Sequence, residues 1–439
     1  MNEHLASHAL EVLFKQCRGC THCMKVCPTS AIRIQRGKAF IKEELCIDCG
    51  QCLASCPNHA IRVQQESLSK IEQFTYRCAI IPAAFFAQFP ESITPSQVLF
   101  ALGKLGFTHT YLAETGVDIL SHLQKEARAS LYPLISNYCP AVVHLIQIRF
   151  PLLVENLGTL RPPAQVTALF ARSELASLGG TLGIFYLTPC AAKIAQFRTE
   201  GSEEGRLFDG ILKFDTVFNQ INAILAKQKS ESGARNHELT FPYATQQSLL
   251  WSLVKGELVG KGGRTLAVDE MHNVIEFLEI LEDSEQTNLQ FLELEACAEG
   301  CVGGILTIRN RFLASESLRH WADSLPSCLP EQAVARIEQQ RQNLAPNLHL
   351  SPFEAKAVLG LDSDHTKALH KMEKVEQIVS ALPGIDCALC GSPSCRVLAE
   401  DIAKGDASIR QCVVLKLKDP KQLNALAKIW GRRTTGAIE

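Results

Sequence analysis

A doubled run of cysteines near the N-terminus constrains this chain more than any other feature of its sequence. Each run has the form C-x2-C-x2-C-x3-C-P, and the two runs comprise Cys17, Cys20, Cys23 and Cys27, then Cys46, Cys49, Cys52 and Cys56. A loop with cysteines at this spacing can wrap a cluster of iron and sulfide and aim backbone N–H groups at its sulfur atoms. The first part of the chain is therefore expected to fold around metal.

The doubled run is the pattern of bacterial ferredoxins with two 4Fe-4S clusters, in which the fourth cysteine of each run serves the other cluster. It predicts one cluster on Cys17, Cys20, Cys23 and Cys56, and a second on Cys46, Cys49, Cys52 and Cys27. A zinc-binding repeat is the alternative, although zinc sites usually pair two C-x2-C knuckles across a longer gap. Residues 1–70 are predicted to form this small α+β domain, with short strands around a turn at Arg36-Gly37.

The 18 cysteines of the 439-residue chain suit metal ligation better than disulfides. The N-terminus has no basic segment followed by an apolar one, so we expect no signal peptide, and the cytosol keeps thiols reduced. The longest apolar stretch, 78–89, is interrupted by Pro82 and is too short to span a bilayer. The 44 Lys and Arg nearly balance the 46 Asp and Glu, which argues against a nucleic-acid partner. We expect a soluble, cytoplasmic protein without a transmembrane segment.

Residues 71–320 alternate strand-like and helix-like segments, which predicts an α/β core with a largely parallel sheet. The predicted strands are 76–86, 108–116, 131–136, 182–190, 211–214 and 288–297. The predicted helices are 96–105, 117–127, 140–153, a helix with Asp215 as its N-cap, and 271–281. The glycine-rich run 258–263 lacks the spacing of a phosphate-binding loop, so an ordinary loop is expected there.

A helical connector is predicted for 321–375, and a separate small helical domain for 376–439. This last segment contains Cys387, Cys390, Cys395 and Cys412 in a C-x2-C-x4-C-x16-C pattern. A helix over 396–404 would bring Cys412 back to the other three. The segment resembles the small four-cysteine 4Fe-4S domain of corrinoid iron–sulfur proteins and of some membrane-associated electron-transport subunits. Zinc is again the alternative.

Four further cysteines lie in three short motifs at the ends of predicted strands. They are Cys139 in SNYCPAVV, Cys190 in TPCAAK, and Cys297 and Cys301 in EACAEGCVGG. In this order the motifs resemble the signature loops of iron-only (FeFe) hydrogenases, and the first loop resembles the sensory-type branch of that family. The resemblance covers about residues 1–320 and implies an α/β core with two lobes around a cluster. A set of plain buried thiols is the alternative.

The resemblance implies that these four cysteines bind the 4Fe-4S part of the hydrogen-activating cluster, with Cys301 bridging to a two-iron unit. It implies that Lys193 hydrogen-bonds a cyanide of that unit, whereas the alternative is a surface lysine. Pro163-Ala164-Gln165 resembles a segment of the family whose glutamine, here Gln165, lies around the two-iron unit. Whether that unit is present is left open by the sequence.

The sequence departs from the family at the positions that carry protons. The relay cysteine of the first loop is Tyr138 here, and a phenol with a pKa of about 10 is a poorer shuttle near neutral pH than a thiol at about 8.5. The relay glutamate of the second loop is Gln196, which cannot titrate. The methionines that flank the diiron site are Thr188 and Glu295. Fast proton delivery needs groups whose pKa lies near the working pH, so we expect the relay to be lost.

The sequence favours a multi-cluster protein that relays single electrons through about four 4Fe-4S clusters, as an electron-transfer subunit or a sensor of H2 or redox state. An active but slow FeFe hydrogenase is the second candidate, and an iron–sulfur assembly or carrier protein is the third. A flavoprotein, a ferredoxin or another iron–sulfur subunit is the expected partner in a hetero-complex. The ferredoxin domain and the C-terminal cluster, at opposite ends of the chain, are expected to face different partners. Cys78 and Cys328 are expected only to pack.

Overall fold

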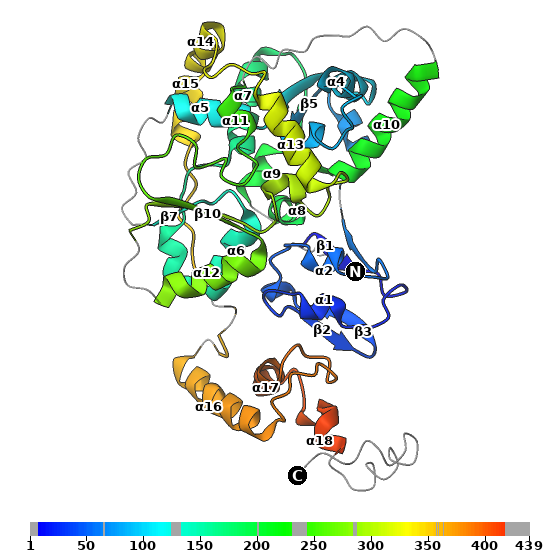
Figure 1. Ribbon diagram of the computed structural model, residues 1–439, viewed down its shortest axis with the longest axis vertical. Helices are drawn as coiled ribbons and strands as arrows, with labels where there is room; N and C mark the ends of the chain where they lie inside the picture. The colour runs from blue at the N-terminus through cyan, green and yellow to red at the C-terminus, as the bar shows by residue number, and fades with distance from the viewer. Residues whose placement is uncertain are drawn as a thin grey trace. The chain divides into compact units, whose positions relative to one another are not determined.

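The computed structural model describes residues 8–64, 66–123, 133–199, 202–230, 244–283, 288–356, 358, 360–362 and 364–417. The chain divides into two compact units. The first unit comprises residues 1–11, 47–50 and 63–356, and the second comprises 12–46, 51–62 and 357–439. Figure 1 shows both units and labels many of their helices and strands.

Two parallel sheets form the framework of the first unit. The larger sheet has the order β6-β5-β8-β9, with β5 (Tyr76–Ile81), β6 (His109–Leu112), β8 (Leu182–Thr188) and β9 (Gly210–Lys213). The smaller sheet has the order β10-β11-β7, with β7 (Leu134–Ile135), β10 (Thr265–Asp269) and β11 (Phe291–Glu295). Every strand pair in these two sheets is parallel. This confirms the α/β core that the alternation of segments predicts.

Helices connect and cover these strands (Figure 1). Those described in the first unit are α3 (Ala83–Phe86), α4 (Pro95–Lys104), α5 (Thr115–Leu123), α6 (Pro140–Arg149), α7 (Pro163–Glu174), α8 (Ala191–Arg198), α9 (Glu203–Leu207), α10 (Phe214–Ser230), α11 (Gln246–Leu249), α12 (Met271–Asp283), α13 (Arg311–Ala322), α14 (Glu331–Gln339) and α15 (Arg341–Leu344). Short 3-10 turns occur at η2 (Leu68–Gln73), η3 (Pro151–Asn156), η4 (Leu175–Ser177), η5 (Gly300–Gly303) and η6 (Ala345–Asn347).

The larger sheet is anchored by a cluster of buried aromatic rings. The ring of Phe85 lies 4.9 Å from that of Phe214 and 5.4 Å from that of Phe89, in edge-to-face arrangements. Such pairs add to the burial of their apolar area, and a closely packed core holds its surroundings rigidly. This core fixes the carboxyl end of β8, after which Cys190 and Lys193 follow.

In the second unit, the residues between the two cysteine runs form a hairpin. The strand β2 (Ile32–Gln35) pairs antiparallel with β3 (Lys38–Ile41). Arg36 and Gly37 between them have φ angles of 51° and 72°, as a type I′ turn requires, so the predicted turn is confirmed. The short elements around the hairpin are α1 (His22–Lys25), η1 (Glu43–Leu45) and α2 (Gln51–Ala54), and β1 (Leu10–Val12) pairs with β4 (Ile61–Val63).

The C-terminal part of the second unit is helical, as predicted. Its elements are α16 (His365–Ala381), α17 (Cys395–Lys404), η8 (Ile409–Gln411) and α18 (Val413–Leu417). The helix α17 begins where the Ser394 side chain accepts a hydrogen bond from the Val397 N–H. It ends at Gly405, whose φ of 92° allows the left-handed C-terminal cap. Val375 of α16 and Leu398 of α17 are buried in the small core of this part.

Several elements differ from their sequence predictions for local reasons. The helix α6 ends at Arg149 because Pro151 cannot continue it. The helix α10 begins at Phe214, so Asp215 lies inside its first turn and is not the predicted N-cap. Chain without α-helix lies between 348 and 364 among the described residues, so the connector is not continuously helical. No helix of the described part of the chain is long and apolar enough to cross a membrane.

Candidate iron–sulfur centres

The first predicted ferredoxin set gathers around one cavity. Cys17, Cys20, Cys23 and Cys56 all line it, together with Ile34 and Ala39 of the hairpin. Burial, and the charges of the other three cysteines, raise the pKa of the Cys23 thiol to about 11. Neighbouring thiols raise one another's pKa because their thiolates repel, and a bound metal removes that repulsion. The cavity therefore brings together three cysteines of the first run and the last of the second.

Backbone N–H groups point at sulfur atoms around this domain. The N–H groups of Ala39, Ala31 and Ala60 donate to the sulfur atoms of Cys17, Cys27 and Cys56 at 3.2, 3.2 and 3.3 Å. Donors of this kind stabilise negative charge on cluster ligands and raise the reduction potential of the cluster. The residues present therefore fit an iron–sulfur cluster. Of the second predicted set, Cys52 is buried, and Cys27, Cys46 and Cys49 are partly buried.

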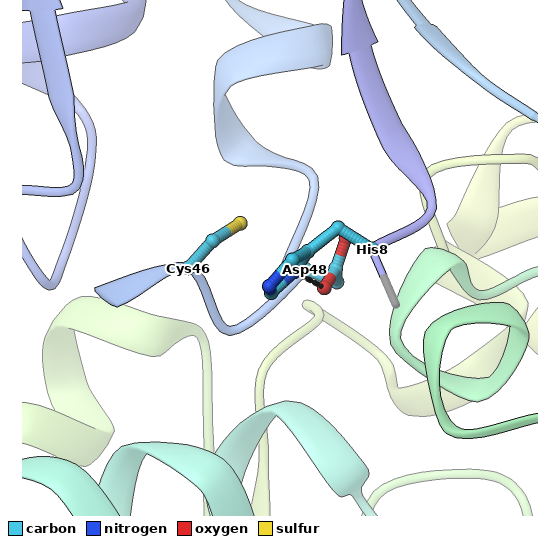
Figure 2. A group of neighbouring side chains, drawn as sticks. All are labelled: His8, Cys46 and Asp48. Carbon is cyan, nitrogen blue, oxygen red and sulfur yellow. Dashed lines mark hydrogen bonds and ion pairs between the residues drawn. The ribbon is translucent and has the colours of Figure 1, made fainter. Parts of the chain in front are cut away.

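A hydrogen-bonded aspartate fixes the loop of the second cysteine run. Figure 2 shows His8 and Asp48, whose Nδ1 and Oδ2 atoms lie 2.7 Å apart. The other oxygen of Asp48 accepts from the N–H groups of Ala9 and Leu10. Figure 2 also labels Cys46, the first cysteine of the second run.

The C-terminal cysteines also surround one cavity. Cys387, Cys390, Cys395 and Cys412 all line it, together with Leu398 of α17. Asp386, Ala388 and Gly391 have positive φ angles of 44°, 60° and 86°, so the loop curls tightly around this space. Burial raises the pKa of the Cys390 thiol, and the charges of Cys387 and Cys412 add to the effect. The four thiols therefore converge as a single ligand set would.

The four core cysteines come from the ends of both parallel sheets. Cys139 follows β7, Cys190 follows β8, Cys297 follows β11, and Cys301 lies in η5. Burial, then the charges of Cys190, Cys139 and Cys301, raise the pKa of the Cys297 thiol well above its usual value. Burial and the charge of Cys190 likewise raise the pKa of Cys139 to about 12. Residues separated by more than 150 positions are thus brought into one electrostatically coupled set.

Lys193 and Tyr138 lie against one member of this set. The Lys193 Nζ is 3.9 Å from the Cys301 sulfur, and it lies over the Tyr138 ring, 4.3 Å from its centroid. The Tyr138 hydroxyl is 3.6 Å from the same sulfur. Burial lowers the pKa of the Lys193 ammonium group, but the charges of Cys301, Tyr186, Cys190 and Cys139 together outweigh burial and raise that pKa above its usual value. Lys193 is therefore a fixed cation at the cysteine set and not a free surface lysine.

The remaining predicted site residues are arranged differently. Gln165 is buried in α7, and its side-chain oxygen accepts a hydrogen bond from Arg161 at 2.9 Å. Gln196 is partly buried on α8, three residues after Lys193. Thr188 is buried at the end of β8, and its hydroxyl accepts from the Cys190 N–H. It thereby helps to set the turn that presents Cys190.

Buried polar atoms without partners lie beside Cys301. Among the described residues, the Trp251 Nε1, the Ser252 hydroxyl and the Glu295 Oε1 are buried and have no hydrogen-bond partner. The Ser252 carbonyl accepts from the Cys301 N–H at 2.9 Å, and a Cβ at Gly300 would lie 2.6 Å from the Glu295 carboxylate. Buried polar groups are normally satisfied, so a bound group with polar ligands fits here. The residues at the core site thus fit an iron–sulfur cluster with polar surroundings.

Glu114 and Glu257 are buried acids that the sequence motifs did not indicate. The Glu114 carboxylate accepts from the Ala83 N–H, and burial raises its pKa to about 8. The Glu257 carboxylate accepts from the Ser136 hydroxyl, and burial raises its pKa to about 7. Both carboxylates interact with the charge of Lys193. The only sequence signal for Glu114 was its position near the end of the predicted strand 108–116.

The two cysteines outside the predicted ligand sets differ in their surroundings. Cys78 is fully buried in β5, as expected for a packing residue. Cys328 is exposed, so the expectation that it packs is wrong. It lies in the short non-helical segment between α13 and α14, flanked by Pro326 and Pro330.

Three family models match separate parts of the chain. The 4Fe-4S dicluster domain matches residues 10–78, and the iron only hydrogenase large subunit, C-terminal domain, matches residues 76–248. The FeS family, which describes an Fe-S cluster, matches residues 382–414. The matched families agree with the resemblances that the cysteine motifs indicated.

Among curated proteins, the chain is similar to one component of the ion-translocating oxidoreductase complex. It is 54% identical over 37 residues to this component in Thiobacillus denitrificans and 47% identical over 38 residues to that of Rhodobacter capsulatus. These stretches are 8% and 9% of this chain and 20% of each relative. The chain therefore spans about a fifth of the length of the curated relatives that it matches.

Solved structures of FeFe hydrogenases match a larger part of the chain. The HydA1 enzyme of Chlamydomonas reinhardtii matches over 66% of this chain and 98% of its own, with 14% identity and a TM-score of 0.47. An FeFe hydrogenase structure that concerns oxygen inactivation matches with the same coverage and a TM-score of 0.48. By these family matches, the chain has a part similar to the C-terminal domain of the iron only hydrogenase large subunit, with a 4Fe-4S dicluster domain before it and an Fe-S domain after it.

Proposed function

We propose that this chain is a multi-cluster electron-transfer protein whose hydrogenase-like core receives electrons but is poorly supplied with protons. It would act as an electron-relay subunit or as a sensor of H2 or redox state. The observation that carries the proposal is the pair of groups at the two relay positions, the phenol of Tyr138 and the amide of Gln196. Each bound 4Fe-4S cluster would supply one-electron redox chemistry.

Electron entry into the core is supported by a close contact inside the first unit. Gly50 directly follows the predicted ligand Cys49, and a Cβ on Gly50 would lie 2.0 Å from the Cδ1 of Ile305. Ile305 follows the predicted ligand Cys301 by four residues. The loop of the second ferredoxin cluster and the loop of the core site are therefore in van der Waals contact, which favours electron transfer between them.

Proton delivery is limited by the chemistry of the same core. Burial, followed by the charge of Cys301, raises the pKa of the Tyr138 phenol well above its usual value. An amide such as that of Gln196 does not titrate at all. A group that exchanges protons efficiently needs a pKa near the working pH, and neither side chain has one.

The second candidate function is a slow FeFe hydrogenase. It is favoured by Lys193, which lies 3.9 Å from the Cys301 sulfur, and by the unpartnered polar atoms of Trp251, Ser252 and Glu295. These groups could surround a diiron unit with polar ligands. Under this function the chain would catalyse H2 oxidation or proton reduction, and the relay positions would set its low rate.

Infrared spectroscopy of the CO and CN stretching region, combined with H2 turnover, tests the two functions. Protein matured with the hydrogenase assembly machinery is the sample. The electron-transfer function predicts reduction of all clusters by a low-potential donor with negligible H2 turnover. Turnover at a rate that matches electron delivery to the clusters would overturn it in favour of the hydrogenase.

The partners of the chain are inferred from its cluster domains. The similarity to a component of an ion-translocating oxidoreductase complex supports a hetero-complex with another iron–sulfur or flavin protein. Co-purification of the full chain under anaerobic conditions, followed by flavin and iron analysis of the captured proteins, tests this assignment.

A further inference from the structure

The C-terminal domain and the ferredoxin domain pack against each other within the second unit. Figure 1 shows α17 beside the β2–β3 hairpin. The Arg33 guanidinium donates to both carboxylate oxygens of Asp401, with Nε to Oδ2 at 2.5 Å and Nη2 to Oδ1 at 3.1 Å. Two domains that lie far apart in the sequence are thus held together by a salt bridge.

Lys42 extends this ion pair into a small network. Its ammonium group donates to the carboxylates of Asp401 and Asp406, each at 2.9 Å. The side chains of Arg33 and Asp401 are only 5% and 7% exposed. Burying these charges is costly unless they are paired, so removal of Asp401 would leave the Arg33 guanidinium without its carboxylate, and removal of Arg33 would leave Asp401 with Lys42 alone. The network therefore specifies one docking geometry and penalises others.

The docked surfaces bring a cluster-binding loop onto the hairpin. The Ile34 N–H donates to the Gly391 carbonyl at 2.8 Å. Gly391 has a φ of 86°, and a Cβ there would lie 2.0 Å from the Ile34 carbonyl oxygen, so only glycine fits this approach. Gly391 directly follows the predicted ligand Cys390 and touches the backbone of β2.

The same isoleucine belongs to the wall of the first ferredoxin cavity. Ile34 lines that cavity together with Cys17, Cys20, Cys23 and Cys56. One residue thus contacts the C-terminal cluster loop through its backbone and lies in the wall of the ferredoxin cavity. A short link between the two cysteine sets therefore consists of the Ile34–Gly391 hydrogen bond and Ile34 itself.

We propose that the Arg33–Asp401 pair docks the C-terminal domain on the ferredoxin domain so that their two cluster sites form an electron-transfer junction across Gly391 and Ile34. The junction rests on the proposed function, because both sites must hold 4Fe-4S clusters. One electron passes from the C-terminal site, which is oxidised, to the Cys17 site, which is reduced, and no bond forms or breaks. A reduced one-electron donor, an iron–sulfur or flavin protein, supplies that electron at the C-terminal site.

This order assigns the C-terminal domain as the entry point for electrons. The electrons then pass through the ferredoxin domain, whose second cysteine loop contacts Ile305 of the core. The C-terminal domain does not need a separate acceptor, in contrast to an arrangement with one partner at each end of the chain. The partner surface would lie on the exposed part of the Cys387 loop, where Ile385 and Leu389 are 59% and 64% exposed.

The test compares full-length, reconstituted variants at equal iron content. Asp401→Asn and Arg33→Met each remove one partner of the pair, and the double variant tests whether the two residues act as a unit. Glu376→Gln is the matched control, because Glu376 of α16 forms an exposed ion pair with Arg396 of α17, the helix that also carries Asp401. Hydrogen exchange of the peptide that contains Ile34 measures docking, and magnetic coupling between reduced clusters measures the junction.

We expect exchange at the Ile34 amide to accelerate about tenfold or more in Asp401→Asn and in Arg33→Met, with loss of one magnetic coupling. The double variant should be no worse than the more affected single variant, and Glu376→Gln should behave as the wild type. Unchanged exchange and coupling in both single variants would overturn the junction. Rapid H2 turnover with intact coupling would instead overturn the proposed function and leave the junction standing.

Discussion

The hydroxyl oxygen of Tyr138 lies 3.6 Å from the sulfur of Cys301. The ammonium group of Lys193 lies over the face of the Tyr138 ring, 4.3 Å from its centroid, and 3.9 Å from the same sulfur. The phenol, the ammonium group and the sulfur of the predicted bridging ligand therefore form one group of mutual contacts. Burial and the charge of Cys301 both raise the pKa of the phenol well above its usual value. Release of its proton near neutral pH is therefore disfavoured, which suits a hydrogen-bonding group better than a proton relay.

Replacing Tyr138 and Gln196, the residues at the two relay positions, should restore proton delivery to the core. If the core holds a diiron unit, Tyr138→Cys combined with Gln196→Glu is expected to raise H2 turnover at least about tenfold, a conservative share of what positioned acid–base groups contribute. Turnover by the matured protein, with infrared bands as the loading standard, is the measurement. Tyr138→Phe is the control, because it keeps the ring under Lys193 and adds no titratable group. An equal rate in wild type and double variant at equal loading would refute the relay argument.

Metal analysis should distinguish iron from zinc at every cysteine set. Four predicted sets imply about sixteen iron atoms and no zinc in anaerobically reconstituted protein. Cys395→Ser should remove about four iron atoms, because it breaks only the C-terminal set. Cys328→Ser is the matched control, since Cys328 is exposed and belongs to no predicted set. An iron content near half of the expected value would rule out the core and C-terminal assignments together.

Glu114 should make the stability of the protein depend on pH. Its pKa rises from an ordinary value near 4.5 to about 8 in the folded protein, mainly through burial. Between these values the folded state binds a proton that the unfolded state releases, so stability falls as pH rises from about 4.5 to about 8. Glu114→Gln mimics the protonated acid and should therefore stabilise the protein above pH 8 relative to wild type, by about 2 to 5 kcal/mol.

Thermal unfolding under anaerobic conditions at acidic and alkaline pH checks this expectation. The gain from Glu114→Gln should be present on the alkaline side and vanish toward pH 5. Glu276→Gln, at an exposed position of α12, is the matched control. A gain of equal size at both pH values would show that Glu114 is not the titrating group.

The sequence predicted those parts of the site that depend on local spacing. Cys17, Cys20 and Cys23 lie close together in one short loop that lines their cavity, so the cysteine spacing was sufficient to predict that their side chains converge. The hairpin at Arg36-Gly37 followed from alternation and turn chemistry in the same way. Such features need no knowledge of which distant segments meet.

The parts that the sequence did not predict depend on distant contacts. Arg33 and Asp401 are separated by 368 residues, and nothing in either local segment marks a buried ion pair. Glu114 and Ser252 have no motif either, and their role near Cys301 depends on how α5 and the chain after α11 pack. Asp215 shows a smaller failure, since helix α10 starts at Phe214, two residues earlier than an N-cap at Asp215 would allow. Tertiary packing decided each of these cases.

The contact between Gly50 and Ile305 should contribute both to stability and to electron transfer into the core. Comparing alanine variants of Gly50 and Gly37 separates the effect of this contact from the effect of backbone strain. Gly50 and Gly37 have similar φ angles, 77° and 72°, so alanine at either position costs about 1 kcal/mol of backbone strain. A Cβ at Gly37 meets nothing within 4 Å, whereas one at Gly50 would lie 2.0 Å from Ile305. Gly50→Ala should therefore lower the free energy of unfolding by roughly 1 to 3 kcal/mol more than Gly37→Ala. It should also slow reduction of the core cluster in stopped-flow experiments with a low-potential donor, while reduction of the ferredoxin clusters stays fast. If Gly37→Ala and Gly50→Ala had the same free energy of unfolding and the same rate of core-cluster reduction, the contact with Ile305 would contribute neither to stability nor to electron transfer.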